Sequence, residues 1–136
     1  MFLLVAFIGW LVSQVGKYLI HSVQVKSFKD WGYLYRSGSM PSAHTSIIVS
    51  LVTYTGLIEG VTSSVFALGV VVAAIVMYDA MQVRRSVGEQ GRAIEEIIKN
   101  SHIKRPYIAM GHRPSEVAVG ATLGLLVGIV AFFITK

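Results

Sequence analysis

The chain has 136 residues and no cysteine, which gives it the length of one small domain and excludes disulfide and thiol chemistry. Hydrophobic residues make up 54% of it and charged residues 14%, about half the charged share of an ordinary soluble domain, so the composition excludes a typical soluble protein. The formal net charge of +5 matches basic residues that flank membrane spans, and without a nucleic-acid-binding motif we expect no nucleic-acid partner.

Four long blocks of the sequence are nearly free of charge, and each approaches the roughly 20 apolar residues that a helix needs to cross the hydrocarbon core. The first predicted span covers residues 2–20, with Lys17 near its end, where its long side chain can reach the membrane surface. It lacks the basic start and the small-residue cleavage site of a signal peptide. The other predicted spans cover residues 41–58, 65–83 and 116–135.

The polar segment before the last span divides into a helix and a loop. Residues 84–100 have apolar side chains on one side, which indicates an amphipathic helix lying at the membrane surface. Residues 101–113 read as a loop, and Pro114 suits the first turn of the helix that follows. The sequence therefore predicts an all-α integral membrane protein with about four transmembrane helices plus one interfacial amphipathic helix. Residues 1–136 are expected to form a single membrane-embedded domain.

Lysine and arginine are unevenly distributed between the polar stretches. Ten of the twelve lie in residues 21–40 and 84–113, whereas the turn at residues 59–64 has none. The positive-inside rule therefore predicts a multi-pass protein of the cell membrane, with both basic stretches in the cytoplasm and both termini outside.

Two polar clusters open the second and the fourth predicted spans. The first holds Ser42 and His44, and the second holds His112 and Glu116, each beside basic residues. Helix N-termini favour anions, and guanidinium groups fork onto phosphate oxygens. His112 and Glu116 lie four residues apart, so they share a helix face on which the carboxylate can fix the tautomer of the imidazole. These features predict a phosphate-handling site in which two histidines divide the roles of nucleophile and general acid.

The histidines are far apart in sequence and lack a second ligand nearby, so we expect no metal. Taken alone, Ser42 could be an ordinary helix cap and Glu116 a first-turn acid that complements the helix dipole. Asp79, near the end of the third predicted span, is expected to pair with Arg84 or Arg85, for either a functional or a structural reason.

The two clusters resemble motifs of the divergent branch of the type-2 phosphatidic acid phosphatase and vanadium haloperoxidase superfamily. The segment Pro-Ser-Ala-His at residues 41–44 is similar to its P-S-G-H motif. His112, with Glu116 four residues later, resembles the end of its third motif, with Glu in place of Asp. Lys29 and Arg36 match the spacing of its K-x6-R-P motif, although serine replaces the proline. The Ser-Arg pair of the third motif is missing.

The resemblance implies a lipid phosphate phosphatase of the acid phosphatase type that needs no metal or cofactor. It implies that His112 attacks phosphorus to form a phosphohistidine, Glu116 orients it, and His44 protonates the leaving oxygen. The implied substrate is a lipid-linked phosphate or pyrophosphate presented by the bilayer. The phosphate would be cradled by polar and basic side chains, namely Lys29, Arg36, Ser42, Arg84, Arg85, Lys104 and Arg105.

Two other functions stay open at this point: a non-catalytic protein that binds or transports phospholipids or lipid phosphates in the same pocket, and a purely structural membrane subunit. The last span raises a separate question, because Gly120, Gly124 and Gly128 recur at every fourth position. This pattern permits close helix packing, either within the chain or in a homo-oligomer.

Overall fold

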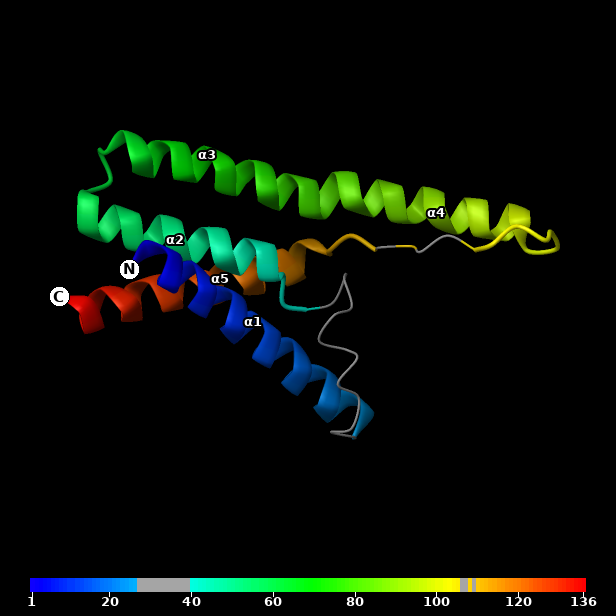
Figure 1. The fold of residues 1–136 in the computed structure, drawn as a ribbon, viewed down its shortest axis with the longest axis horizontal. Coiled ribbons are helices and arrows are strands. Elements are labelled where there is room, and N and C mark those ends of the chain that lie inside the picture. The colour runs from blue at the N-terminus through cyan, green and yellow to red at the C-terminus, as the bar shows by residue number, and fades with distance from the viewer. Residues whose placement is uncertain (27–39, 106–107, 109) are drawn as a thin grey trace.

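A computed structural model of the chain describes residues 1–26, 40–105, 108 and 110–136, and within these residues every regular element is a helix (Figure 1). The elements in chain order are α1 (Phe2–Val25), α2 (Ala43–Glu59), α3 (Ser64–Tyr78), the π-helical turn η2 (Asp79–Val83), α4 (Arg84–Ile98) and α5 (Pro114–Thr135). The predicted all-α membrane architecture is confirmed.

Helix α2 lies at the centre of the bundle and contacts α1, α3 and α5. Its buried positions carry small or hydroxyl-bearing side chains, which let the neighbouring helices approach closely. The Ser46 hydroxyl donates to the Gly9 carbonyl of α1 at 2.9 Å, and Tyr54 and Thr135 of α5 share a hydrogen bond of 3.1 Å. These polar groups are thus paired between helices, as the absence of water in a membrane favours.

The glycine stripe of α5 packs inside the chain. A Cβ added at Gly120 or Gly124 would lie 2.6 or 2.7 Å from a backbone carbonyl oxygen of Ser42 or Ser46, and at Gly128 it would meet Thr53 at 2.6 Å. Of the two uses that the sequence left open for these glycines, packing within the chain is the one observed, against α2.

Three helical segments are long and apolar enough to cross a membrane among the residues described: Phe2–Val25, Ser64–Ile98 and Pro114–Thr135. Helix α2 has 17 residues, somewhat fewer than the roughly 20 of a full span, although it lies between the others. The predicted count of four spans is therefore approximate.

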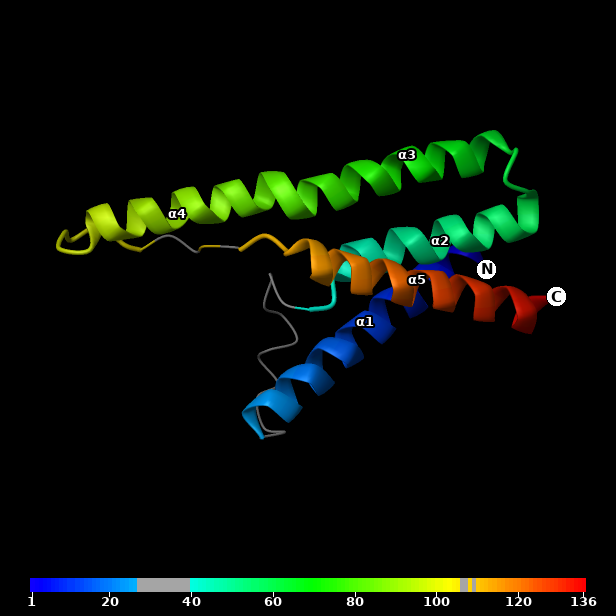
Figure 2. The same cartoon turned by 180° about the vertical axis from the view of Figure 1, so that it is seen from behind.

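The predicted amphipathic helix is present as α4 (Arg84–Ile98), and it continues directly from α3. Helices α3 and α4 form one rod of 35 residues through η2, and the rod extends beyond the rest of the bundle (Figures 1 and 2). The physical reason is local: residues 77–87 contain neither glycine nor proline, so nothing breaks the helical hydrogen bonding, and the π turn widens it without ending it. The amphipathic character that the sequence indicated lies on this extension.

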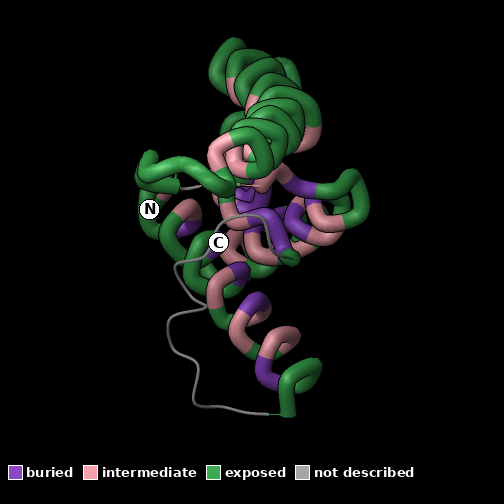
Figure 3. Tube along the Cα trace, turned by 90° about the vertical axis from the view of Figure 1, so that its right-hand side faces the viewer, coloured by how far each residue is buried: buried purple, intermediate pink, exposed green. Residues whose placement is uncertain are grey.

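The bundle has two distinct ends. Both termini and the turn between α2 and α3 lie at one end, and α2 and α5 both begin at the other (Figure 1). Buried segments gather where the helices meet, and most of the α3–α4 rod is exposed (Figure 3). The exposed side chains in the α3 part of the rod are apolar, with Leu68 66% and Ile75 62% exposed. Such a surface suits contact with lipid.

Candidate functional site

His112 and Glu116 form a close pair at the start of α5. The Nδ1 atom of His112 lies 3.0 Å from Oε2 of Glu116, and the two side chains are only 10% and 17% exposed. The same carboxylate oxygen accepts the backbone N–H of Arg113 at 3.1 Å, which fixes its position. With Glu116 ionised, Nδ1 carries the proton and donates, so the ring is held in the tautomer whose Nε2 has a free lone pair.

The backbone of His112 is held by the π turn. The His112 N–H donates to the carbonyl of Ala80 in η2 at 2.9 Å, and Ala80 is buried. The preceding Gly111 lies directly against the backbone of Arg85, where a Cβ would collide with main-chain atoms. A π turn leaves its carbonyls differently aimed from those of an α-helix, and such turns are common at functional sites. Here the π turn η2 positions the backbone of His112.

The N-terminus of α2 lies beside the same pair. The Ser42 N–H donates to the Glu116 carbonyl at 3.2 Å, and the Thr45 hydroxyl donates to the Ser42 hydroxyl at 3.0 Å. The side chain of the N-cap residue Ser42 accepts no backbone N–H of the first turn, so those N–H groups keep their capacity to bind an anion. His44 lies on this turn and is exposed.

Charged side chains from three other helical segments act on His44 electrostatically. The Asp79 carboxylate pairs with the Arg84 guanidinium at 2.6 Å, which confirms the predicted pairing of Asp79. The charges of Arg84, His112, Lys17 and Asp79 all act on His44. Charges from α1, from the rod and from the start of α5 thus reach His44 on α2.

Lys17 is the residue that the sequence interpretation missed. It was expected to reach the membrane surface from the end of a span, but α1 continues to Val25, and Lys17 is only 5% exposed. Its neighbour Gly16 faces Pro41 at the start of α2, and its charge interacts with that of Glu116. A lysine within an apolar block was the available signal, since ionisable residues inside spans usually face a functional interior.

The other predicted cations lie elsewhere or are not described. Arg85 pairs with Glu89 at 3.2 Å on an exposed surface. Arg105 pairs with Glu95 at 3.6 Å, and Glu95 lies 11 residues beyond Arg84, roughly 16 Å further along the helix. Lys104 is exposed. Lys29 and Arg36 fall outside the described residues.

The cluster has the elements of an anion site with an activated imidazole. The residues described contain no group of three or more potential metal ligands. Two cations, the N–H groups of a helix start and a fixed histidine tautomer come together at one end of the bundle. A tetrahedral oxyanion is the ligand that these groups suit best.

Comparison with known proteins finds a family and a relative of the chain. The model of a family described as the divergent PAP2 family matches residues 1–127. The chain is 32% identical over 122 residues to an uncharacterized membrane protein, YuiD, of Bacillus subtilis (strain 168), covering 76% of this chain and 77% of the relative. No solved structure matches.

Proposed function

The chain belongs to the divergent PAP2 family, and on that premise we propose that it is a membrane phosphatase for lipid-linked phosphate or pyrophosphate. One observation carries the proposal: the Nδ1 atom of His112 lies 3.0 Å from the Glu116 carboxylate, next to the uncapped N-terminus of α2. This arrangement leaves Nε2 of His112 as a nucleophile beside a place suited to a phosphoryl group.

The proposed reaction has two steps. Nε2 of His112 attacks phosphorus, the new P–N bond forms, and the P–O bond to the lipid breaks while the protonated His44 gives its proton to the leaving oxygen. His44, now neutral, then takes a proton from water as that water attacks the phosphohistidine, which releases inorganic phosphate and restores His112. Glu116 keeps the Nδ1–H donor in place and stabilises the positive charge that the ring gains during attack.

Lys17 and Arg84 are the proposed ligands of the phosphate oxygens, together with the first-turn N–H groups of α2 and Ser42. Lys17 is buried, so its charge acts through a medium of low dielectric and interacts more strongly with an anion than a solvated lysine would. Arg84 is held by Asp79, which orients its guanidinium. No metal or cofactor takes part in the proposed chemistry.

Phosphate release is the direct experiment. Purified protein in detergent is incubated with lipid monophosphates, lipid pyrophosphates and p-nitrophenyl phosphate, in the presence of EDTA. We expect phosphate release by the natural chain and none by His112→Ala at equal concentration and equal folding by circular dichroism. Equal release by both proteins would reject the proposal.

Replacing Lys17 tests the phosphate ligands. We expect Lys17→Met to raise the inhibition constant of inorganic phosphate about 10- to 100-fold, because one charge-assisted contact to the anion is lost, and Lys17→Arg to restore part of the affinity. Lys26→Met, further along the chain and exposed, is the matched control and should change nothing. Unchanged phosphate inhibition in Lys17→Met would exclude Lys17 from the site.

The proposed site faces the cytoplasm, and both termini face outward. Because the natural chain has no cysteine, a single introduced cysteine is the only residue of the protein that a maleimide labels, and it reports on which side of the membrane that position lies. In intact cells, a membrane-impermeant maleimide should label Thr62→Cys, in the turn between α2 and α3, and should label Ser101→Cys only after lysis. Labelling of both from one side would contradict the arrangement, and the reverse pattern would place the site outside.

A non-catalytic protein that binds or transports a lipid phosphate or phospholipid is the second candidate. One observation favours it: the Arg84 guanidinium is already engaged by Asp79 at 2.6 Å, and the sequence has no Ser-Arg pair before His112 to replace it. Less positive charge would then remain to stabilise the negative charge of the phosphoryl group in the transition state. This candidate predicts phosphate-sensitive lipid binding without release of phosphate.

A further inference from the structure

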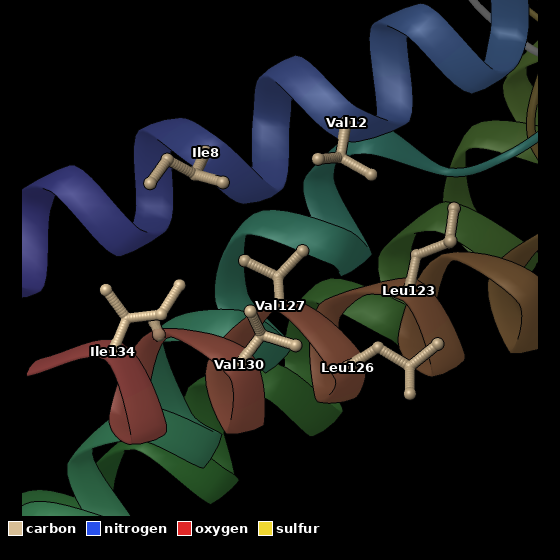
Figure 4. Close-up of a pocket in the computed structure, with 8 residues that line it drawn as sticks. Ile8, Val12, Leu123, Leu126, Val127, Val130 and Ile134 are labelled. Atoms are coloured by element: carbon tan, nitrogen blue, oxygen red, sulfur yellow. The ribbon is translucent and has the colours of Figure 1, made fainter.

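An apolar groove runs between α1 and α5 (Figure 4). It encloses about 360 Å³, and every side chain that lines it is apolar. The lining residues used below are Ile8 and Val12 of α1 and Leu123, Val127, Val130 and Ile134 of α5. Several of them remain partly exposed, including Val12 at 36% and Val130 at 54%, so the groove is open along one side.

The groove continues the helix face that carries the polar site. Leu123, Val127, Val130 and Ile134 follow Glu116 by 7, 11, 14 and 18 residues, spacings that return to one face of a helix with 3.6 residues per turn. Leu123 lies roughly 10 Å along the axis from Glu116. A molecule bound at Glu116 and extending along this face of α5 would therefore enter the groove directly.

We propose that the groove holds one hydrocarbon chain of the lipid phosphate whose headgroup occupies the His112 site. The proposal rests on the proposed function, and it adds the place of the lipid chain and a lower limit on its length: the chain must reach past Leu123, roughly 10 Å from Glu116. The groove begins at Leu123, roughly 10 Å along the axis from Glu116, and ends at Ile134, roughly 27 Å from it. A chain that reaches from the headgroup to the middle of the bilayer, roughly 15 Å, enters the groove past Leu123, and a longer chain fills more of it.

The volume excludes a helix as the occupant. Spread over roughly 16 Å, about 360 Å³ gives a mean cross-section of roughly 22 Å², whereas a helix about 10 Å across needs roughly 80 Å². The volume is at the low end of the range for small-molecule sites, about 300–1,000 Å³. A second copy of the chain would also bring no phosphate to the site, and α5 already uses its glycine face against α2.

Photocrosslinking tests the occupant without requiring turnover. The probe is a hexadecyl phosphate with a diazirine in the chain, applied to the purified full chain in detergent, with a hexadecanol of the same diazirine position as the neutral control. We expect labelled peptides from residues 123–127 and around Val12, the part of the groove nearest Glu116, and reduced labelling in the presence of inorganic phosphate. Equal labelling by the neutral probe, or labelling that phosphate does not reduce, would show only general lipid contact and would overturn the proposal.

Chain-length dependence gives a second readout. Val127→Trp fills the groove, and Leu125→Trp places the same side chain at an exposed position of α5 that does not line it. We expect Val127→Trp to raise the KM of hexadecyl phosphate about tenfold and to leave hydrolysis of p-nitrophenyl phosphate unchanged. Leu125→Trp should alter neither.

The two proposals fail in different ways. If the natural chain hydrolyses p-nitrophenyl phosphate and Val127→Trp does not affect hexadecyl phosphate, the groove assignment is wrong and the phosphatase function stands. If no substrate is hydrolysed, the phosphatase function is wrong, and the crosslinking pattern still decides whether the groove holds the chain of a bound lipid phosphate.

Discussion

His112→Ala is expected to abolish hydrolysis of both lipid phosphates and p-nitrophenyl phosphate. The reason is that Nε2 of His112 forms the bond to phosphorus, and no leaving group can compensate for a missing nucleophile. His44→Ala is expected to lower the rate of hydrolysis of lipid phosphates about 10²–10⁴-fold, the usual contribution of a general acid. With p-nitrophenyl phosphate, the rate of P–O bond cleavage in this variant should fall far less, because a nitrophenolate leaves without a proton.

Glu116→Gln separates the orientation of His112 from its chemistry. Glutamine keeps the size of the side chain but removes the charge that favours the Nδ1–H tautomer and the charged ring. We expect its activity to fall between the natural chain and His112→Ala on every substrate. The measurement is the release of nitrophenolate in the first turnover, monitored by rapid mixing in detergent at saturating substrate. A burst is expected from His44→Ala and none from His112→Ala, and the absence of a burst in both variants would refute the division of roles.

Gly111→Ala is expected to reduce activity at least 100-fold, although no catalytic atom is changed. A Cβ at this position collides with the main chain of Arg85, which cannot rotate out of the way as a flexible side chain can. The segment must move away from η2, and the 2.9 Å bond from the His112 N–H to the Ala80 carbonyl breaks. Displacement of the imidazole by about 1 Å is enough to cost such a factor.

Gly91→Ala is the matched control for this change. A Cβ there meets only the side chain of Ile108, at 3.2 Å, and that side chain can shift. Both variants are measured for initial rate and for thermal unfolding in detergent. Activity of Gly111→Ala close to that of Gly91→Ala would show that η2 does not position His112.

The helical framework could be predicted largely from the sequence because the apolar blocks are long and their boundaries are polar. The predicted last span, residues 116–135, agrees closely with α5 (Pro114–Thr135). The first span was placed five residues short, since His21 and Ser22 read as an exit from the membrane, whereas the helix continues until Lys26 adopts a left-handed conformation. The direction of a helix axis has no local signal, so the sequence did not show that residues 84–98 continue in line with α3.

Local pairs of the candidate site could also be predicted. The spacing of His112 and Glu116 puts both on one face of a helix, and the nearness of Asp79 to Arg84 gives an ion pair within one rod. The position of Lys17 depends on how α1 packs against the start of α2, which no local pattern encodes. The pairing of Arg105 with Glu95 depends likewise on the path of the loop back along α4.

The proposed phosphohistidine can be trapped in a variant that forms it and cannot hydrolyse it. His44→Ala should still accept the phosphoryl group from p-nitrophenyl phosphate, but it lacks the base that activates water for the second step. Rapid quenching in alkali and mass spectrometry of the peptides should reveal a phosphoryl group on His112, in an adduct that is stable to alkali and labile to acid. Release of phosphate by the natural chain with no adduct on His112, or with the adduct on another residue, would contradict the account.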